Sequence, residues 1–89
     1  MAVFRGTGTG TIQSTPYNIP ATISSFSIVN IEVGDINVSV RIDGLLITAL
    51  DFTLKAGQAY IRDTAIRMKI DDIISIDTSG EIEYYFTIE

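Results

Sequence analysis

The stretch RGTGTGTIQSTP, residues 5–16, is the first candidate for chemistry, because glycine-rich loops can hold phosphate groups. A phosphate-binding loop of the GxGxxG or GxxxxGK[ST] type joins a strand to a helix and has glycines at fixed spacings. Here the glycines fit neither spacing, no lysine follows, and the next residues favour an extended chain. The sequence therefore predicts no nucleotide and no other cofactor at this stretch.

Carboxylates are the other groups that could act chemically, since the chain has no histidine and no cysteine. Their absence excludes the usual general base at neutral pH, Ser-His and Cys-His nucleophile pairs, and most zinc sites. The 11 acidic residues could supply a two-carboxylate hydrolase site, but a chain of 89 residues offers little volume for a substrate cleft. We predict no catalytic residues and no enzymatic activity.

The densest acidic group is Asp71 and Asp72, with Asp77 five residues further on. Calcium prefers several oxygen ligands from a shaped loop, and DDIISID lacks the spacing and the turn glycine of an EF-hand loop. A hairpin turn at Asp71-Asp72 explains the same residues. We therefore predict no metal site.

Composition and charge bear on the partners of the chain. It is 46% hydrophobic and contains 16 isoleucines, more branched side chains than one small core can bury, which predicts a homo-oligomer. The net charge of −5, with basic and acidic residues interleaved, predicts no nucleic-acid partner, because such binding needs a basic face. No segment approaches the roughly 20 apolar residues of a membrane span, so we expect no membrane partner.

From Ser24 onward the apolar residues alternate with period two, which predicts β-strands. Any functional site must therefore be formed by residues on strands or on the turns between them. The clearest case is residues 36–43, after which Asp43-Gly44 supplies a hairpin turn and residues 45–54 return. Residues 81–89 alternate in the same way, and Ser79-Gly80 is expected to turn the chain into them. The order predicts an antiparallel sheet.

Short segments separated by turn residues at intervals of roughly ten residues are typical of an all-β sandwich or barrel. We predict an all-β fold, a small antiparallel β-sandwich of jelly-roll or Ig-like type with about seven or eight short strands. A change of apolar parity near Ile28-Val29 predicts a bulge or a strand that passes between two sheets. The alternative is a helix over residues 54–68, which Gly57 and several β-branched residues disfavour.

The pattern from about residue 26 to residue 89 resembles small β-sandwich structural proteins of tailed bacteriophage particles. The residues that carry it are Asp43, Gly44, Leu54, Ala56, Gly57, Tyr60, Asp63, Asp71 or Asp72, Ile74 and Gly80. The resemblance implies an auxiliary or decoration subunit of the capsid, made in the host bacterial cytoplasm and located in the virion. It also implies a homo-oligomer such as a trimer, and other phage structural proteins, such as the major capsid protein, as partners. Asp43, Gly44, Gly57, Asp63 and Gly80 are assigned turn or other structural roles.

Apolar residues outside the expected inward set are the candidates for an assembly interface. They are Val3, Phe4, Tyr17, Ile19 and Tyr85. We expect residues 1–22 to form an extended N-terminal arm that contacts another subunit, and residues 23–89 to form the sandwich domain. Deletion of residues 1–15 should then leave the sandwich folded. The alternative function is a tail, neck or fibre module that binds a host-surface glycan through Tyr17, Tyr60 or Tyr85.

Overall fold

The computed structural model of the chain describes residues 2–17, 19–42, 45–46 and 52–89. The strands in these ranges are β1 (Ala2–Gln13), β2 (Ala21–Asn30), β3 (Ile36–Ile42), β4 (Leu45–Leu46), β5 (Phe52–Leu54), β6 (Ala59–Met68) and β7 (Ile74–Ile88). All pairings between them are antiparallel. The all-β prediction is confirmed. The alternative helix over residues 54–68 is wrong, because β6 occupies most of that range.

The long strand β7 is the centre of a single sheet. On one side it pairs with β1 along almost its whole length. On the other side, its residues 82–88 pair with β2 and its residues 74–78 pair with β3. Beyond these strands lie β6, which pairs with β2, and β4 and β5, which pair with β3. Strands β2 and β3 therefore lie end to end along the same edge of β7.

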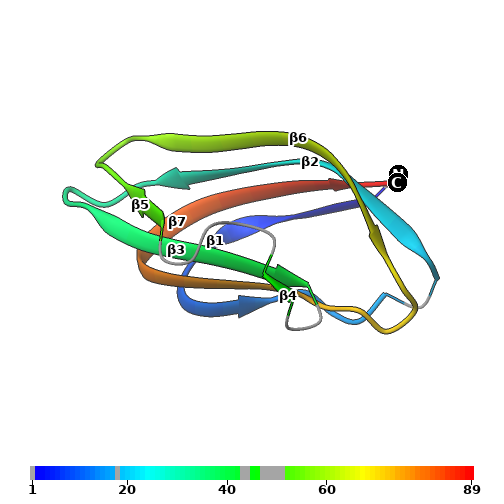
Figure 1. Ribbon diagram of the computed structural model, residues 1–89. Helices are drawn as coiled ribbons and strands as arrows, with labels where there is room; N and C mark the ends of the chain where they lie inside the picture. Colours follow the sequence, from blue (N-terminus) through cyan, green and yellow to red (C-terminus); the bar gives the residue numbers. More distant parts are fainter. Residues whose placement is uncertain (1, 18, 43–44, 47–51) are drawn as a thin grey trace.

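The sheet bends sharply across the middle of β7, so that its two halves face each other as a half-barrel (Figure 1). At the bend the register of β1 shifts between Gly8 and Gly10, and Gly10 takes a positive φ of 76°. The β2–β3 connection, residues 31–35, leaves the sheet at the same level. In place of two separate sheets, the chain thus has one curled sheet whose halves form the two layers.

Gly80 lies at this bend, inside β7, and does not separate two strands as expected. The strand continues because the inward alternation of Thr78, Gly80 and Ile82 is unbroken. The Thr78 hydroxyl donates to the Gly80 carbonyl at 2.7 Å and accepts from the Gly80 N–H at 3.3 Å. A side chain on Gly80 would overlap Ile36, so the tight packing of the bend requires glycine here.

Aromatic rings link the two layers across the core. Phe26 of β2 stacks on Phe86 of β7, with ring centroids 4.8 Å apart, and also contacts Tyr60 of β6 at 5.8 Å. Tyr60 in turn contacts Phe52 of β5, in the other layer, at 4.8 Å. Burial of a Phe side chain stabilises a fold by about 1.5–3 kcal/mol, so this cluster contributes a substantial part of the packing energy.

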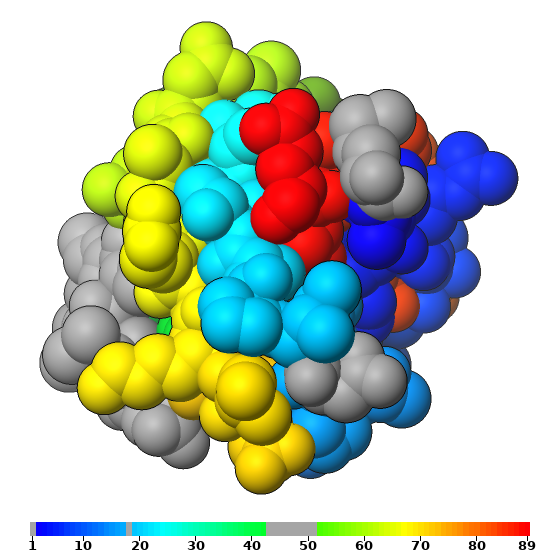
Figure 2. Space-filling model, turned by 90° about the vertical axis from the view of Figure 1, so that its right-hand side faces the viewer, coloured from blue at the N-terminus to red at the C-terminus, as the bar shows by residue number. Residues whose placement is uncertain are grey.

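The end of the half-barrel near the termini is covered by two connections (Figure 2). The β1–β2 connection runs beside the β6–β7 turn, and the Tyr17 backbone accepts from the Asp71 N–H at 2.7 Å and donates to the Asp72 carbonyl at 3.3 Å. Asp71 has a positive φ of 72°, which an aspartate in a turn tolerates. The two acidic residues thus shape a turn.

The other residues that were predicted to form turns or a bulge differ in where they lie in the structure. Gly57 lies in the β5–β6 turn with a φ of 74°, whereas Asp63 lies in the middle of β6 and not in a turn. Asp43 and Gly44 lie outside the described residues. Strand β2 has its register shift between Ile23 and Ser25, earlier than the predicted parity change, and it ends at Asn30.

The glycine-threonine run forms β1 and pairs with β7 of the same chain. Its alternation matches the strand period: Thr7 and Thr9 face outward, while Gly6 and Gly8 face the core. The Tyr84 ring occupies the space where a Gly6 side chain would lie. The run is thus ordered within one chain, and the expected boundary at residue 22 falls inside β2.

Candidate interaction surface

The outward residues of β1, β7, β2 and β6 form a broad sheet face, which we call the outer face. It comprises Val3, Arg5 and Thr7 of β1; Glu83, Tyr85 and Thr87 of β7; Ser25, Ser27 and Val29 of β2; and Ala59, Ile61 and Asp63 of β6. The alternation of each strand sends these side chains away from the core. Most of them are short, so the face is low in relief except where longer side chains project.

The middle row of the outer face carries its largest apolar side chains. The register places Tyr85 beside Ser27, and Ser27 beside Ile61. Ile61 is 74% exposed and Tyr85 is 42% exposed, while Ser27 between them is half-buried. Large apolar side chains that are exposed together mark surfaces that bury against another protein, and tyrosine is enriched at such surfaces.

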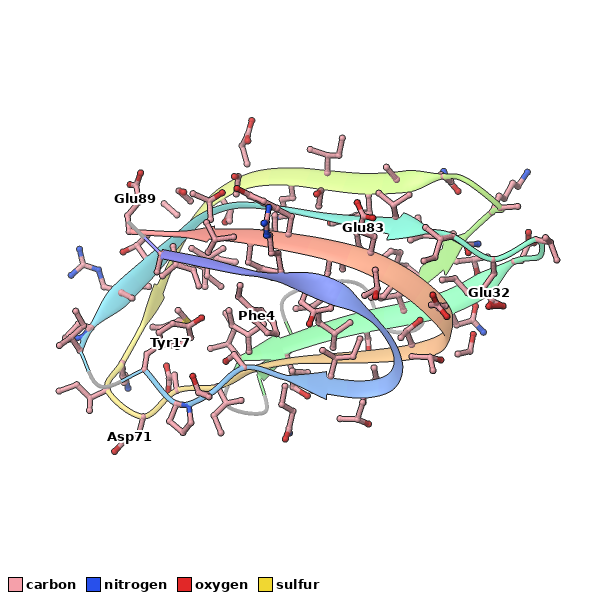
Figure 3. The ribbon with its side chains drawn as sticks, turned by 180° about the vertical axis from the view of Figure 1, so that it is seen from behind. Phe4, Tyr17, Glu32, Asp71, Glu83 and Glu89 are labelled. Carbon is pink, nitrogen blue, oxygen red and sulfur yellow. The ribbon has the colours of Figure 1, made fainter. Side chains whose placement is uncertain are left out.

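Opposite charges lie at the β1 side of the outer face. The Arg5 guanidinium carbon is 6.0 Å from the centre of the Tyr85 ring, which is a cation–π distance. Thr7 pairs with Glu83 in the next row. A surface hollow of about 350 Å³ is lined by these four residues and by Gly6 and Tyr84. In Figure 3, Glu83 points away from the sheet, whereas Phe4 points between the two layers.

The structure brings two of the five predicted interface residues together on the outer face. Val3 is 42% exposed and lies diagonally across from Tyr85. Phe4 instead faces the core, with ring centroids 4.9 Å from Tyr84 and 5.8 Å from Phe86. Its position in an alternating strand, directly after an outward residue, explains the difference.

The other two predicted interface residues, Tyr17 and Ile19, lie in the β1–β2 connection. Ile19 is 65% exposed, and both line a hollow of about 220 Å³ at the end of the molecule. Partial burial raises the pKa of the Tyr17 hydroxyl above its ordinary value of 10.0, and a hydrogen bond with Ser14 opposes this shift. Neither Tyr17 nor Ile19 belongs to the outer face.

Ile61 is the interface candidate that the sequence reading missed. It lies in β6 between Tyr60 and Arg62, where both alternating sets contain apolar and charged residues. The period alone therefore did not decide which set faces the core. The signal that could have found it is the end of the strand, where Ile66 and Met68 alternate with Arg67; the same alternation continued toward the start of β6 places Ile61 on the outward side.

The second layer presents a polar face on its outward side. Arg41 of β3 forms an ion pair with Asp77 of β7 at 2.6 Å and donates to the Ser39 hydroxyl at 3.2 Å. Asp77 also accepts from the Thr11 hydroxyl of β1 at 3.0 Å. These bonds hold the Asp77 carboxylate between β1 and β3. This face is bound together by its own polar groups.

Asp77 therefore contacts groups on β1 and β3, whereas the other two acids of the predicted cluster, Asp71 and Asp72, belong to the β6–β7 turn. The Asp72 carboxylate accepts from the Lys69 N–H at 2.7 Å, within the β6–β7 turn. Within the ranges that the structure describes, no group of three or more His, Cys, Asp or Glu side chains could hold a metal ion. Nor does any helix in those ranges have the length and apolar character to cross a membrane.

Comparison with models of known protein families gives no match, and a search of curated proteins finds no relative of the chain.

Proposed function

We propose that the chain is a non-enzymatic structural subunit that assembles into a larger particle through its outer face. The observation that carries the proposal is the projection of Ile61 and Tyr85 from an otherwise low sheet face. Apolar side chains in such a position are stabilised by burial against another protein, at about 25 cal/mol per Å² of apolar surface removed from water. On the opposite face, Arg41 and Thr11 both bond to Asp77, which supports the assignment of the contact to the outer face.

The particle that we propose is a tailed bacteriophage, because of the resemblance of residues 26–89 to small structural proteins of such particles. In this proposal the chain is an auxiliary or decoration subunit of the capsid, made in the host cytoplasm and located in the virion. It forms a homo-oligomer and contacts the major capsid protein. The two halves of the curled sheet serve as the layers of a sandwich-type module.

A binding experiment with phage particles that lack the chain tests this proposal. Purified chain is mixed with such particles and sedimented, and the bound fraction is measured over a range of concentrations. We expect Ile61→Ser to weaken binding on the order of tenfold, whereas Ile70→Ser, which removes an isoleucine 57% exposed on the β6–β7 turn, should leave binding unchanged. Absence of wild-type binding, or equal binding by both variants, would contradict the proposal.

One observation favours a second function, a tail, neck or fibre module that binds a host-surface glycan. The hollow beside Tyr85 combines an exposed ring with Arg5 and Glu83, which can hydrogen-bond sugar hydroxyls. An NMR titration with host-surface oligosaccharides distinguishes the two functions. Shifts confined to residues around this hollow would favour the glycan module, and Tyr85→Ala should abolish them.

A further inference from the structure

One edge of β1 has no partner among the described strands. Its backbone direction follows from the C-terminal end of the chain, where Glu89 and Thr22 exchange both backbone hydrogen bonds at 2.8 Å. Successive residues of a strand direct these groups to opposite sides, so Ile88, Phe86 and Tyr84 direct theirs to β1. Their β1 partners are Ala2, Phe4 and Gly6. The N–H and C=O groups of the residues between, Val3, Arg5 and Thr7, therefore face away from the sheet.

This edge has few of the features that normally prevent strand pairing between molecules. Edge strands are usually protected by charged residues, prolines, β-bulges or a short length, and the register shift of β1 lies at Gly8–Gly10, at one end of the stretch around Gly6. β1 has 12 residues, no proline and one charged residue, Arg5. The edge strand at the other side of this layer, β6, carries Arg62, Asp63 and Arg67. Of the two outer strands of the layer, β1 is the one open to pairing.

We propose that β1 pairs antiparallel with β1 of a second copy, about a two-fold axis at Gly6, to join two sheets into one. This arrangement places Arg5 opposite Thr7 of the second copy, and the two-fold symmetry makes this pair twice. These are the residues whose backbone groups face the edge, so each pair can exchange two hydrogen bonds. The inference deepens the proposed function and depends on it for its biological role, because it names the self-contact of the assembling subunit.

Charge selects this register. Within one chain Thr7 is paired with Glu83, so Arg5 of one copy lies in the same row as Thr7 and Glu83 of the other. The hollow of about 350 Å³ between Arg5, Thr7, Glu83 and Tyr85 is where the second guanidinium enters. The two-fold axis repeats the contact. A register one step away, with Arg5 opposite Arg5, would place like charges side by side, which is unfavourable.

Side-chain size on the inner side of the edge agrees with the same register. Phe4 is placed opposite Gly8 of the second copy, and Gly6 opposite Gly6. A large residue opposite a small one avoids crowding, and the glycines allow close approach of the two backbones. An aromatic ring beside an edge glycine also covers backbone that would otherwise be exposed.

The pairing would place the outer faces of two copies side by side as one continuous surface. A contact made by one strand from each copy is small, so we expect a weak dimer with a dissociation constant on the order of 1–100 µM. Pairs of weak contacts then act together when the dimer binds a particle with repeated sites.

Sedimentation velocity of the full chain at about 1–500 µM tests the proposal by charge exchange. The wild type should shift with concentration from its monomer mass of 9.7 kDa to twice that value. Arg5→Glu and Glu83→Arg should each weaken dimerisation on the order of tenfold, and the double variant should recover most of the loss. A wild type that stays monomeric throughout, or a double variant as weak as the two single losses combined, would overturn the proposal.

Thr7→Pro provides a second test that does not depend on charge. It removes an N–H that faces the edge and not β7, and the preceding Gly6 has no Cβ to clash with the proline ring. We expect loss of dimer with native circular dichroism, whereas Thr7→Val should dimerise normally. The pairing also predicts that amide exchange of Val3, Arg5 and Thr7 slows as concentration rises, and exchange independent of concentration would overturn it.

The proposed function and this inference fail in different ways. If the chain binds particles but remains a monomer, edge pairing is wrong and the outer-face proposal stands. If the charge-exchange series behaves as expected but Ile61→Ser binds particles normally, the edge is correctly assigned and the outer face is not.

Discussion

Asn30 holds three segments together through one buried side chain. Its amide group donates to the Gly34 carbonyl at 2.8 Å and to the Leu54 carbonyl at 3.0 Å, and its side-chain oxygen accepts from the Glu32 N–H at 2.8 Å. The side chain is fully buried, and its bond to the Leu54 carbonyl is buried as well, so water cannot replace that bond. The residue therefore fixes the β2–β3 connection against the end of β5.

We predict that Asn30→Ala lowers the free energy of unfolding by about 2–3 kcal/mol, because it removes three hydrogen bonds and leaves the buried Leu54 carbonyl without this partner. Urea unfolding followed by circular dichroism measures this. Asn37→Ala is a matched control, since exposed Asn37 accepts from the Thr53 hydroxyl at 3.0 Å and its loss should cost at most about 1 kcal/mol. Equal losses in the two variants would contradict the account of Asn30.

Gly80 gives a second prediction at the level of single residues. An added Cβ would overlap Ile36 and lie 3.0 Å from Glu32, so Gly80→Ala should lower the free energy of unfolding by about 1–3 kcal/mol. Gly34→Ala has nothing within 4 Å of the added atom and should be neutral or stabilising by up to about 1 kcal/mol. Thermal unfolding of both variants checks the difference, and a stable Gly80→Ala would mean that the bend is not tightly packed.

Tyr17 gives a prediction about pH. Burial raises the pKa of its hydroxyl in the folded chain above the ordinary 10.0, so the unfolded chain loses this proton first as pH rises. The stability that depends on the protonated Tyr17 hydroxyl is fully present below pH 10.0 and is lost as the pH rises through the pKa of Tyr17 in the folded chain. Urea unfolding across this range should show a steeper decline for the wild type than for Tyr17→Phe. Parallel declines would show that Tyr17 does not contribute.

Among the strands, β1 has a larger structural role than the sequence predicted, so removing it should have a different effect. The sequence suggested that residues 1–15 could be deleted without unfolding the domain. In the structure, β1 covers one edge of β7 along both halves, and Phe4 contacts Tyr84 and Phe86. Loss of this strand would expose the backbone of β7 and part of the aromatic core.

We therefore predict that deletion of residues 1–13 abolishes cooperative unfolding. Circular dichroism and thermal melts of the truncated chain measure this directly. A shorter deletion confined to Met1 and Ala2 is the control and should melt close to the wild type. A truncated chain with a sharp, near-native transition would show that the expected arm can be removed after all.

The sequence predicted individual strands better than their arrangement. Alternation was clear in β3 and in residues 81–88, where one face is apolar and the other polar. The joining of residues 74–88 into one strand was not predictable, because Ser79-Gly80 resembles a turn and its packing depends on Ile36, distant in sequence. The pairing of β1 was missed for a similar reason: glycine gives no inward side chain, and its space is filled by Tyr84.

The residues of the outer face were predicted only in part, because the exposure of a residue depends on how its strand is placed in the whole sheet. Tyr85 could be selected from the alternation of its own strand. Val3 and Phe4 were both selected because residues 1–22 were expected to lie outside the sandwich, and the pairing of β1 with β7 decides that Phe4 faces inward. The surplus of isoleucine did point to exposed apolar surface, and Ile61 at 74% exposed is its clearest case. The ends of the chain also lie together, because Ala2 pairs with Ile88 (Figure 1).

The whole molecule is thus a bent sheet with a polar face, a mixed apolar outer face and an open strand edge beside it. We propose that this chain is a structural component of a phage particle. The most direct test is quantitative mass spectrometry of phage particles that are purified on density gradients from cells that carry the gene of the chain. The account predicts peptides of the chain in fixed ratio to the major capsid protein after washing. Recovery of the chain only in the particle-free fraction would contradict it.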